Sequence, residues 1–329
     1  MLRILVLGSG AGGGSPQWNC NCSVCQKVRK GAPGTSPRTQ SSLAVSAREN
    51  EWFLLNASPD LRQQISDRAE LHPKHGHRHS PIMGAVLTNG DVDHVAGLLN
   101  LRESQPLVVY ATHRVQQVLA ANNIFNVLNP EFVTRREFTL NRPTELETPD
   151  GKPSGLVVEP FTVPGKVALY LEDATKGPKF GSQPEDTIGL KVSSRESGDH
   201  FFYIPGCEKM PPDLAARLRG APLVFFDGTL WQDDEMIANN VGVKTGARMG
   251  HMSNSGPDGT IAAFESLDVH RKIFIHINNT NPILIDGSPE RLQAERAGWE
   301  VSFDGMRIEL GAAQTGAREP VRSQAAARR

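Results

Sequence analysis

Acidic and histidine side chains stand at the ends of several apolar segments of this 329-residue sequence. Asp91, Asp93 and His94 follow one such segment, Asp227 ends a second, and His276 lies within a third. Carboxylates and imidazoles together are ligands for divalent cations. A single aspartate at a helix start is usually only a cap, and a single histidine in a strand is usually a core residue. Because several occur at strand ends, the pattern favours one convergent metal site.

Three of the four cysteines form a second cluster, Cys20-x-Cys22-x-x-Cys25. So few cysteines exclude a disulfide scaffold, and three close thiols are typical of a zinc site. The fourth ligand must then come from elsewhere in the fold, whereas an open fourth position would indicate a reactive site. The alternative is three buried thiols without a metal. Cys207 stands alone and is interpreted as a structural thiol.

The glycine-rich loop after the first apolar segment formally matches a dinucleotide-binding motif, with Gly8, Gly10 and Gly13 in the required spacing. That function also needs a helix at the last glycine and an acid about 20 residues later. Neither is present, because the loop leads into the cysteines and residues 28–36 contain no acid. The glycines therefore predict a loop whose backbone approaches another group closely.

Positioning these groups requires a mixture of strands and helices, which predicts an α/β fold with mixed sheets. We expect a helix opened by Ser58-Pro59-Asp60, a strand over Ile273–Ile277, and a closing hairpin of Glu300–Phe303 and Met306–Leu310. The further predicted strands are Arg3–Leu7, Ser42–Ser46, Trp52–Leu55, Gly84–Thr88, Leu107–Tyr110, Gly155–Phe161, Ile188–Val192, Phe201–Ile204 and Leu223–Phe226. The further predicted helices are Val95–Leu101, Thr112–Ala120, Asp213–Leu218 and one beginning at Ser288.

Composition narrows the class of protein. Hydrophobic residues make up 38% of the chain, and 35 basic against 36 acidic residues give a net charge of −1. No global field therefore attracts nucleic acid, and no apolar run is long enough to span a membrane. We expect a cytoplasmic protein with one domain over residues 1–311 and a disordered Arg-rich tail over 312–329. The histidine-rich segment 72–80 is expected to be a mobile loop.

The acid–histidine turn resembles that of the metallo-β-lactamase superfamily, H-x-H-x-D-H. Here it reads Asn89-x-Asp91-x-Asp93-His94, and Lys166 follows Pro-Gly where the superfamily often has a histidine. The resemblance implies that the first metal position of a two-metal hydrolase is largely missing. The second position keeps Asp93, His94 and His276, with Asp227 in place of the bridging acid.

Longer strings are similar to the family of pyrroloquinoline quinone (PQQ) biosynthesis proteins of type B, over about residues 1–310. They are Gly12-Gly-Gly-Ser-Pro-Gln-Trp-Asn-Cys-Asn-Cys, Arg38-Thr-Gln-Ser-Ser, Asn56-Ala-Ser-Pro-Asp, Asp227-Gly-Thr-Leu-Trp-Gln-Asp-Asp-Glu-Met, His276-Ile-Asn-Asn-Thr-Asn-Pro and Phe303-Asp-Gly-Met. The resemblance implies an αββα sandwich of metallo-β-lactamase type. It also implies iron- and oxygen-dependent hydroxylation of the tyrosine ring of a peptide-derived Glu-Tyr precursor of PQQ.

In related phosphodiesterases of phosphonate metabolism, a histidine completes the zinc site of the three cysteines. Asn279 stands at the matching position and is the candidate fourth ligand of a structural zinc ion. For the active site, Asp93, His94 and His276 resemble the ligand set of non-haem Fe(II) oxygenases.

Further roles follow from the same resemblance. Asp91 and Asp227 could ligate the metal or orient water, and His251 could transfer protons. Three basic residues are candidates for binding a substrate carboxylate: Lys166, Lys244 and Arg248.

Two alternatives stay open. The same residues could form a mononuclear zinc hydrolase, or the protein could carry PQQ or its precursor to the periplasm. Whether the chain forms a homo-oligomer also stays open.

Overall fold

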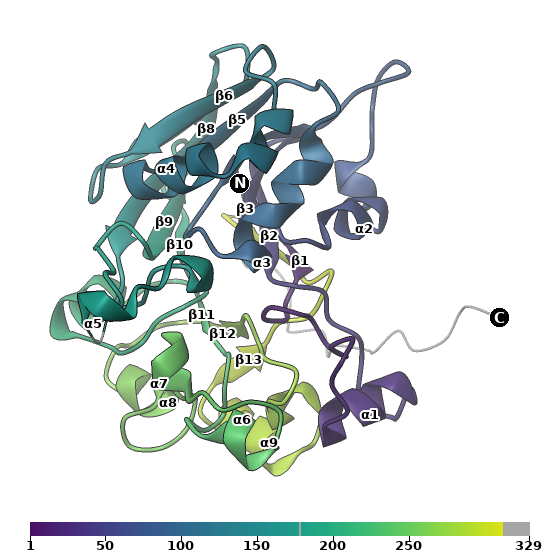
Figure 1. Cartoon of the computed structure of the whole chain (residues 1–329). Coiled ribbons are helices and arrows are strands. Elements are labelled where there is room, and N and C mark those ends of the chain that lie inside the picture. The colour runs from purple at the N-terminus through teal and green to yellow at the C-terminus, as the bar shows by residue number, and fades with distance from the viewer. Residues whose placement is uncertain (178, 312–329) are drawn as a thin grey trace.

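The structure, a computed structural model, describes residues 1–177 and 179–311, and its strands form two seven-stranded sheets (Figure 1). The predicted tail at 312–329 lies outside the described residues. The first sheet has the order β14-β1-β2-β3-β4-β5-β6, with β1 Leu2–Gly8, β2 Ser42–Arg48, β3 Glu51–Leu55, β4 Ile82–Val86, β5 Leu107–Thr112, β6 Val133–Phe138 and β14 Arg307–Leu310. The second has the order β13-β12-β11-β10-β9-β8-β7, with β7 Thr144–Glu147, β8 Pro153–Thr162, β9 Ile188–Ser194, β10 His200–Ile204, β11 Val224–Asp227, β12 Lys272–Ile275 and β13 Trp299–Val301.

Both sheets are mixed in the same way. In the first, the ladders from β14 to β3 are antiparallel and those from β3 to β6 are parallel. In the second, the ladders from β7 to β10 are antiparallel and those from β10 to β13 are parallel. Parallel strands of one sheet end on the same side, so the residues that follow β11 and β12 lie near one another at the end of the second sheet, and those that follow β4 lie at the end of the parallel strands of the first.

Helices cover the outer faces of both sheets. They are α1 Ser23–Arg29, α2 Leu61–Ser66, α3 Val92–Val95, α4 His113–Ala121, α5 Pro212–Leu218, α6 Glu235–Ala238, α7 Gly246–Met249, α8 Thr260–Phe264 and α9 Pro289–Arg296. Short 3₁₀ turns occur at Ala69–Leu71, Ala96–Leu101, Asn123–Val127, Leu169–Leu171, Ala174–Lys176 and Pro282–Leu284.

Three hydrophobic clusters hold these layers together. The central cluster contains buried side chains from both sheets, among them Val45 of β2 and Phe225 of β11. A second cluster packs α2 and α4 on the first sheet, and a third packs α5, α8 and α9 on the second. This arrangement confirms the predicted αββα sandwich with mixed sheets.

The predicted closing hairpin is wrong. β13 pairs with β12 in the second sheet, whereas β14 pairs with β1 in the first. The turn between β13 and β14 forms backbone hydrogen bonds to the second sheet at its start and to the first sheet at its end. Ser302 N–H donates to Phe274 O at 3.0 Å, and Gly305 N–H donates to Val6 O at 2.7 Å. The chain therefore crosses from one sheet to the other instead of folding back.

The helix predicted to open at Ser58 begins later, at Leu61, and Asp60 at its N-cap makes no side-chain capping bond. The predicted capping hydroxyl of Ser58 and the predicted first-turn acid Asp60 both have other partners. Asp60 Oδ2 accepts from Gln40 N at 2.8 Å, and the Ser58 hydroxyl bonds to Gln64 Oε1 at 3.1 Å. The Ser58 hydroxyl therefore bonds to a side chain of the same helix, and Asp60 bonds to a distant segment, so neither side chain caps the helix.

Candidate metal centre

The acid–histidine turn follows β4 and forms the short helix α3. Asp91 is the N-cap residue of α3, and Asp93 and His94 lie within it. The His94 side chain is buried, and that of Asp93 is 19% exposed. The turn therefore delivers one carboxylate and one imidazole to the edge of the first sheet.

Asp227 and His276 reach the same place from the second sheet. β11 and β12 are parallel and pair Asp227 with Ile275, so His276 is the first residue beyond its strand. The prediction of a strand through Ile277 is wrong here, because His276 has a left-handed backbone with φ of 59°. A non-glycine residue in that conformation is uncommon and strained, and such residues cluster at functional sites.

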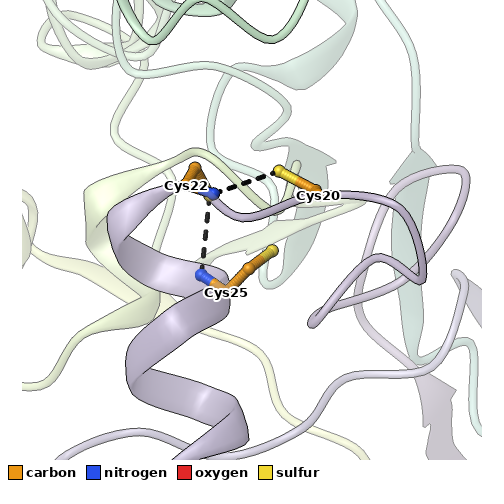
Figure 2. Close-up of side chains that lie close together, drawn as sticks. All are labelled: Cys20, Cys22 and Cys25. Carbon is orange, nitrogen blue, oxygen red and sulfur yellow. Dashed lines mark hydrogen bonds between the residues drawn. The ribbon is translucent and has the colours of Figure 1, made fainter.

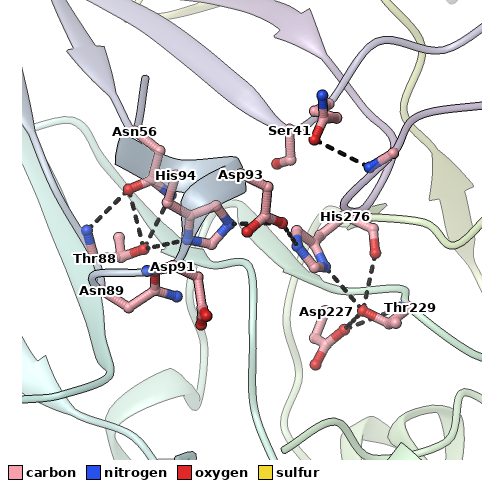
Figure 3. A network of polar contacts seen from close by, with 12 residues as sticks. Ser41, Asn56, Thr88, Asn89, Asp91, Asp93, His94, Asp227, Thr229 and His276 are labelled. Carbon is pink, nitrogen blue, oxygen red and sulfur yellow. Dashed lines mark hydrogen bonds and ion pairs between the residues drawn. The ribbon is translucent and has the colours of Figure 1, made fainter. Parts of the chain in front are cut away.

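The side chains of Asp93, His94 and His276 converge (Figure 3). His276 Nε2 lies 3.1 Å from Asp93 Oδ2, and His94 Nε2 lies 3.9 Å from the same oxygen. One ligand atom from each residue lies within 4.8 Å of the others. Among the described residues, buried His94 Nε2 has no hydrogen-bond partner. A buried nitrogen aimed at a carboxylate and a second imidazole fits a divalent cation.

The protonation states suit metal binding. Burial lowers the pKa of His94 to about 4, so this imidazole is neutral near pH 7. Burial alone would raise the pKa of Asp93, but His94 and the hydrogen bond from His276 hold it well below its usual range. Burial opposes protonation of His276, yet its bond to Asp93 raises its pKa above the ordinary value. A proton and a metal ion therefore compete for one position between Asp93 and His276.

Asp227, His251 and His276 form a second group with ligand atoms within 4.8 Å. His251 Nδ1 lies 2.6 Å from Asp227 Oδ2, and the rings of His251 and His276 stack 5.2 Å apart. Asp227 also accepts from Cys207 N at 2.8 Å, Thr229 N at 3.0 Å and the Thr229 hydroxyl at 2.6 Å. With both oxygens bonded, Asp227 is arranged to orient neighbouring groups.

Asp91 lies beside this centre, outside both groups. Its Oδ1 accepts from Leu169 N at 3.0 Å, on the loop that follows β8. Burial raises the pKa of Asp91, and the nearby charge of Asp93 raises it further.

Two of the three predicted carboxylate-binding residues share one internal partner. Lys166 Nζ lies 2.8 Å from Glu172 Oε1, and Arg248 contacts the two Glu172 oxygens at 3.1 and 2.6 Å. The hydrogen bonds from Arg248 and Lys166 hold the pKa of Glu172 at about 2. Lys244 makes no ion pair with any described residue. A carboxylate does bind Lys166 and Arg248, but it belongs to the protein.

The three cysteines meet at the start of α1 (Figure 2), with their sulfur atoms within 4.8 Å of one another. Asn279 is buried beside them, and its Nδ2 lies 3.2 Å from Cys25 Sγ. A 180° turn of the amide would present its oxygen instead. The predicted cluster and its candidate fourth residue thus lie together. Among the described residues, none of the three ligand groups contains a histidine of segment 72–80.

The structure adds residues that sequence reasoning missed. Threonine hydroxyls stand behind the two histidines of the centre, with Thr229 Oγ1 2.9 Å from His276 Nδ1 and Thr88 Oγ1 3.5 Å from His94 Nδ1. The Asp-Gly-Thr string after an apolar strand was an available signal for Thr229, since it is typical of an Asx turn.

The structure explains why the loop after β1 contains glycine at position 12. A Cβ atom at Gly12 would lie 3.3 Å from Asp93 Oδ2. The close approach predicted for this loop is therefore an approach to the candidate metal centre.

No helix within residues 1–177 and 179–311 has the length and hydrophobicity needed to cross a bilayer.

Comparisons with known proteins agree with this architecture. Residues 51–277 match the family model of the beta-lactamase superfamily domain. A 20% identical diphosphatase from the PhnP family has a TM-score of 0.64 over 94% of this chain and 98% of its own, which shows a shared fold.

Nearer relatives cover almost the whole chain. Coenzyme PQQ synthesis protein B of Gluconacetobacter diazotrophicus is 54% identical over 310 residues, covering 94% of this chain and 99% of that protein. Its counterpart in Xanthomonas oryzae is 53% identical, covering 94% of this chain and 100% of that protein. The crystal structure of Zn²⁺-bound PqqB from Methylobacterium extorquens is 47% identical, with a TM-score of 0.88 over 94% of this chain and 100% of that one. The chain belongs to the coenzyme PQQ synthesis protein B family, within the metallo-β-lactamase superfamily.

Proposed function

We propose that this protein acts in PQQ biosynthesis as an iron- and oxygen-dependent hydroxylase of the tyrosine ring of a peptide-derived Glu-Tyr precursor. Relatives named for PQQ synthesis over nearly the full chain support the pathway. The observation that carries the chemistry is the convergence of Asp93, His94 and His276 around His94 Nε2, an imidazole nitrogen without a hydrogen-bond partner in residues 1–177 and 179–311.

These three residues would hold one divalent cation. Two imidazoles and one carboxylate are the donor set of non-haem Fe(II) oxygenases, which leaves positions for oxygen and substrate. When bound, Fe(II) supplies oxygen chemistry that side chains cannot perform. The cysteine cluster, with Asn279, would hold a structural zinc ion.

The other residues of the centre would manage protons and substrate. His251 donates Nδ1–H to Asp227, which leaves its Nε2 free to accept a proton from a substrate hydroxyl or water. Lys166 and Arg248 would bind the substrate carboxylate after it displaces Glu172 from them. Hydroxylation places one oxygen atom on the ring and reduces the other to water, so the reaction also needs an external two-electron reductant.

The test compares metals and oxygen on one preparation. Protein whose cysteine cluster carries zinc is loaded with Fe(II) or Zn(II) at the site of Asp93, His94 and His276. It is then incubated with a Glu-Tyr peptide and ascorbate, with and without oxygen. We expect a product heavier by one oxygen atom only with Fe(II) and oxygen.

Two other outcomes would contradict the proposal. Cleavage of an ester or amide with Zn(II), independent of oxygen, would identify a mononuclear zinc hydrolase. Tight binding of PQQ or the peptide without turnover under every condition would identify a carrier.

A further inference from the structure

The hydroxyl of Thr229 occupies the junction between the two side-chain groups of the metal centre. Thr229 is buried, and its Oγ1 lies 2.6 Å from Asp227 Oδ1, 2.9 Å from His276 Nδ1 and 3.1 Å from His251 Nδ1. It also lies 2.9 Å from the backbone oxygen of His276. One atom thus contacts both the ring and the main chain of His276 (Figure 3).

A count of hydrogens assigns the direction of these bonds. A threonine hydroxyl has one hydrogen and accepts through its lone pairs. Two oxygen atoms could accept this hydrogen, Asp227 Oδ1 at 2.6 Å and the backbone oxygen of His276 at 2.9 Å. The charged Asp227 oxygen is the stronger and nearer acceptor, so the hydroxyl donates to it. Thr229 must then accept from His276, whose hydrogen lies on Nδ1. With Nδ1–H directed to Thr229, the proton between His276 Nε2 and Asp93, 3.1 Å apart, is the one that a cation displaces, and its loss leaves the Nε2 lone pair for the cation.

The same residue stabilises the unusual backbone of His276. The left-handed φ of 59° directs the ring between Asp93 and Thr229. Thr229 O accepts from Asn278 N at 3.0 Å, and Gly228 N–H donates to Ile275 O at 2.7 Å. The loop that carries Thr229 is therefore bonded to the chain on both sides of His276.

We propose that Thr229 is a positioning residue that holds His276 as the Nδ1–H tautomer in its left-handed conformation, so that Nε2 is presented to a divalent cation. Ligating histidines commonly donate their other ring hydrogen to a carboxylate, carbonyl or water. Here a neutral hydroxyl takes that place and connects His276 to the Asp227–His251 pair. This inference rests on the proposed cation at Asp93, His94 and His276.

The experiment measures metal binding, independently of turnover. Full-length protein with zinc in its cysteine cluster is titrated with Co(II), and affinity and the visible spectrum are recorded for Thr229→Val and Thr229→Ser. We expect the valine variant to bind Co(II) about 10- to 100-fold more weakly with an altered spectrum. The serine variant keeps the hydroxyl and should lie within about threefold of wild type, in line with the hydrogen-bond role.

Thr260→Val is the matched control. Thr260 is fully buried, and its hydroxyl has no hydrogen-bond partner within the described part of the chain. This variant makes the same change of atoms in the core without removing a bond, so its Co(II) affinity should equal that of wild type.

A measurement on wild type keeps the proposal testable if the valine variant fails to fold. In zinc-loaded protein labelled with ¹⁵N-histidine, His276 should show a hydrogen on Nδ1 and a metal-bound Nε2. A hydrogen on Nε2, or unchanged Co(II) affinity and spectrum in a folded Thr229→Val variant, would overturn the role of Thr229. Failure of the underlying site looks different, because His276→Ala would then bind Co(II) as wild type does.

Discussion

Glu235 ties together the loops that carry Thr229 and Asn279, and its replacement by glutamine should change how stability depends on pH. Its Oε2 accepts from Trp231 N at 2.6 Å, and its Oε1 accepts from the Thr280 hydroxyl at 2.5 Å. Burial raises the pKa of this carboxyl to about 7. Near neutral pH the folded protein therefore holds a proton that an unfolded glutamate has already released.

The sign and size of the effect follow from linkage. The carboxyl of an unfolded glutamate has a pKa of about 4.3. Because the folded state binds the proton more tightly, the stability associated with this proton is complete below about pH 4.3 and is lost as pH rises to about 7. A difference between pKa values of about 4.3 and about 7 corresponds to about 4 kcal/mol of unfolding free energy over the whole titration, of which about 3 kcal/mol is lost between pH 5 and pH 8. Glutamine keeps the shape of the protonated acid and has no proton to lose.

The assay is urea unfolding of zinc-saturated wild type and Glu235→Gln at pH 5, 6, 7 and 8. Glu235→Gln should gain stability relative to wild type as pH rises, by up to about 3 kcal/mol at pH 8. Other titrating groups are common to both proteins and cancel in the difference. Glu265→Gln, at an exposed glutamate, is the matched control. A Glu235→Gln difference that stays constant from pH 5 to pH 8 would refute the reasoning.

Four further perturbations test the sites directly. Cys22→Ser should release about one zinc ion per chain and lower the unfolding free energy, as metal analysis and denaturation will show, because structural zinc contributes to folding. Replacing His75, His77 and His79 together with alanine should leave tightly bound metal unchanged, and loss of that metal would place ligands in that segment. Glu172→Gln should tighten binding of a Glu-Tyr peptide several-fold in calorimetry, since it weakens an internal competitor for two cations; weaker binding would contradict this. His276→Ala should lose the active-site metal and keep the cysteine zinc, measured by separate iron and zinc analysis, and retained iron with turnover would exclude the proposed site.

Much of the candidate site was predictable because its residues are metal-ligating types that lie close to apolar segments or to one another in the sequence. Asp93, His94 and His276 each stand next to an apolar segment, and the cysteine spacing is local. Strands β6 and β7 escaped prediction because they form sheet edges and bury few side chains, only Val133 and Phe138 in β6 and Leu146 in β7. Helices α6 and α7 contain four residues each, too few for an apolar period.

The partners of the site residues were beyond sequence reasoning, because they depend on contacts between distant segments. Lys166 and Arg248 were recognisable as cations, but nothing local indicates that Glu172 binds both. The left-handed backbone of His276 is likewise set by the neighbouring β11 loop and by Ser9, whose oxygen accepts from Ile277 N at 3.0 Å. Sequence reasoning therefore extended the strand two residues too far, past Ile275 and through His276.

The replaced histidines of the superfamily motif explain why we propose one metal ion, and not two, at the active site. The positions in question are Asn89, Asp91 and Lys166, and each has a partner within the protein. Asn89 Oδ1 accepts from Asp91 N at 2.9 Å, Asp91 Oδ1 accepts from Leu169 N at 3.0 Å, and Lys166 binds Glu172. An additional cation at these three positions would have to break these bonds. It would also meet the ammonium group of Lys166 where the superfamily has an imidazole. Internal hydrogen bonds and an ion pair thus occupy the groups that would hold this additional ion. The group of Asp93, His94 and His276 differs, because His94 Nε2 has no hydrogen-bond partner among the described residues and can bind a metal ion.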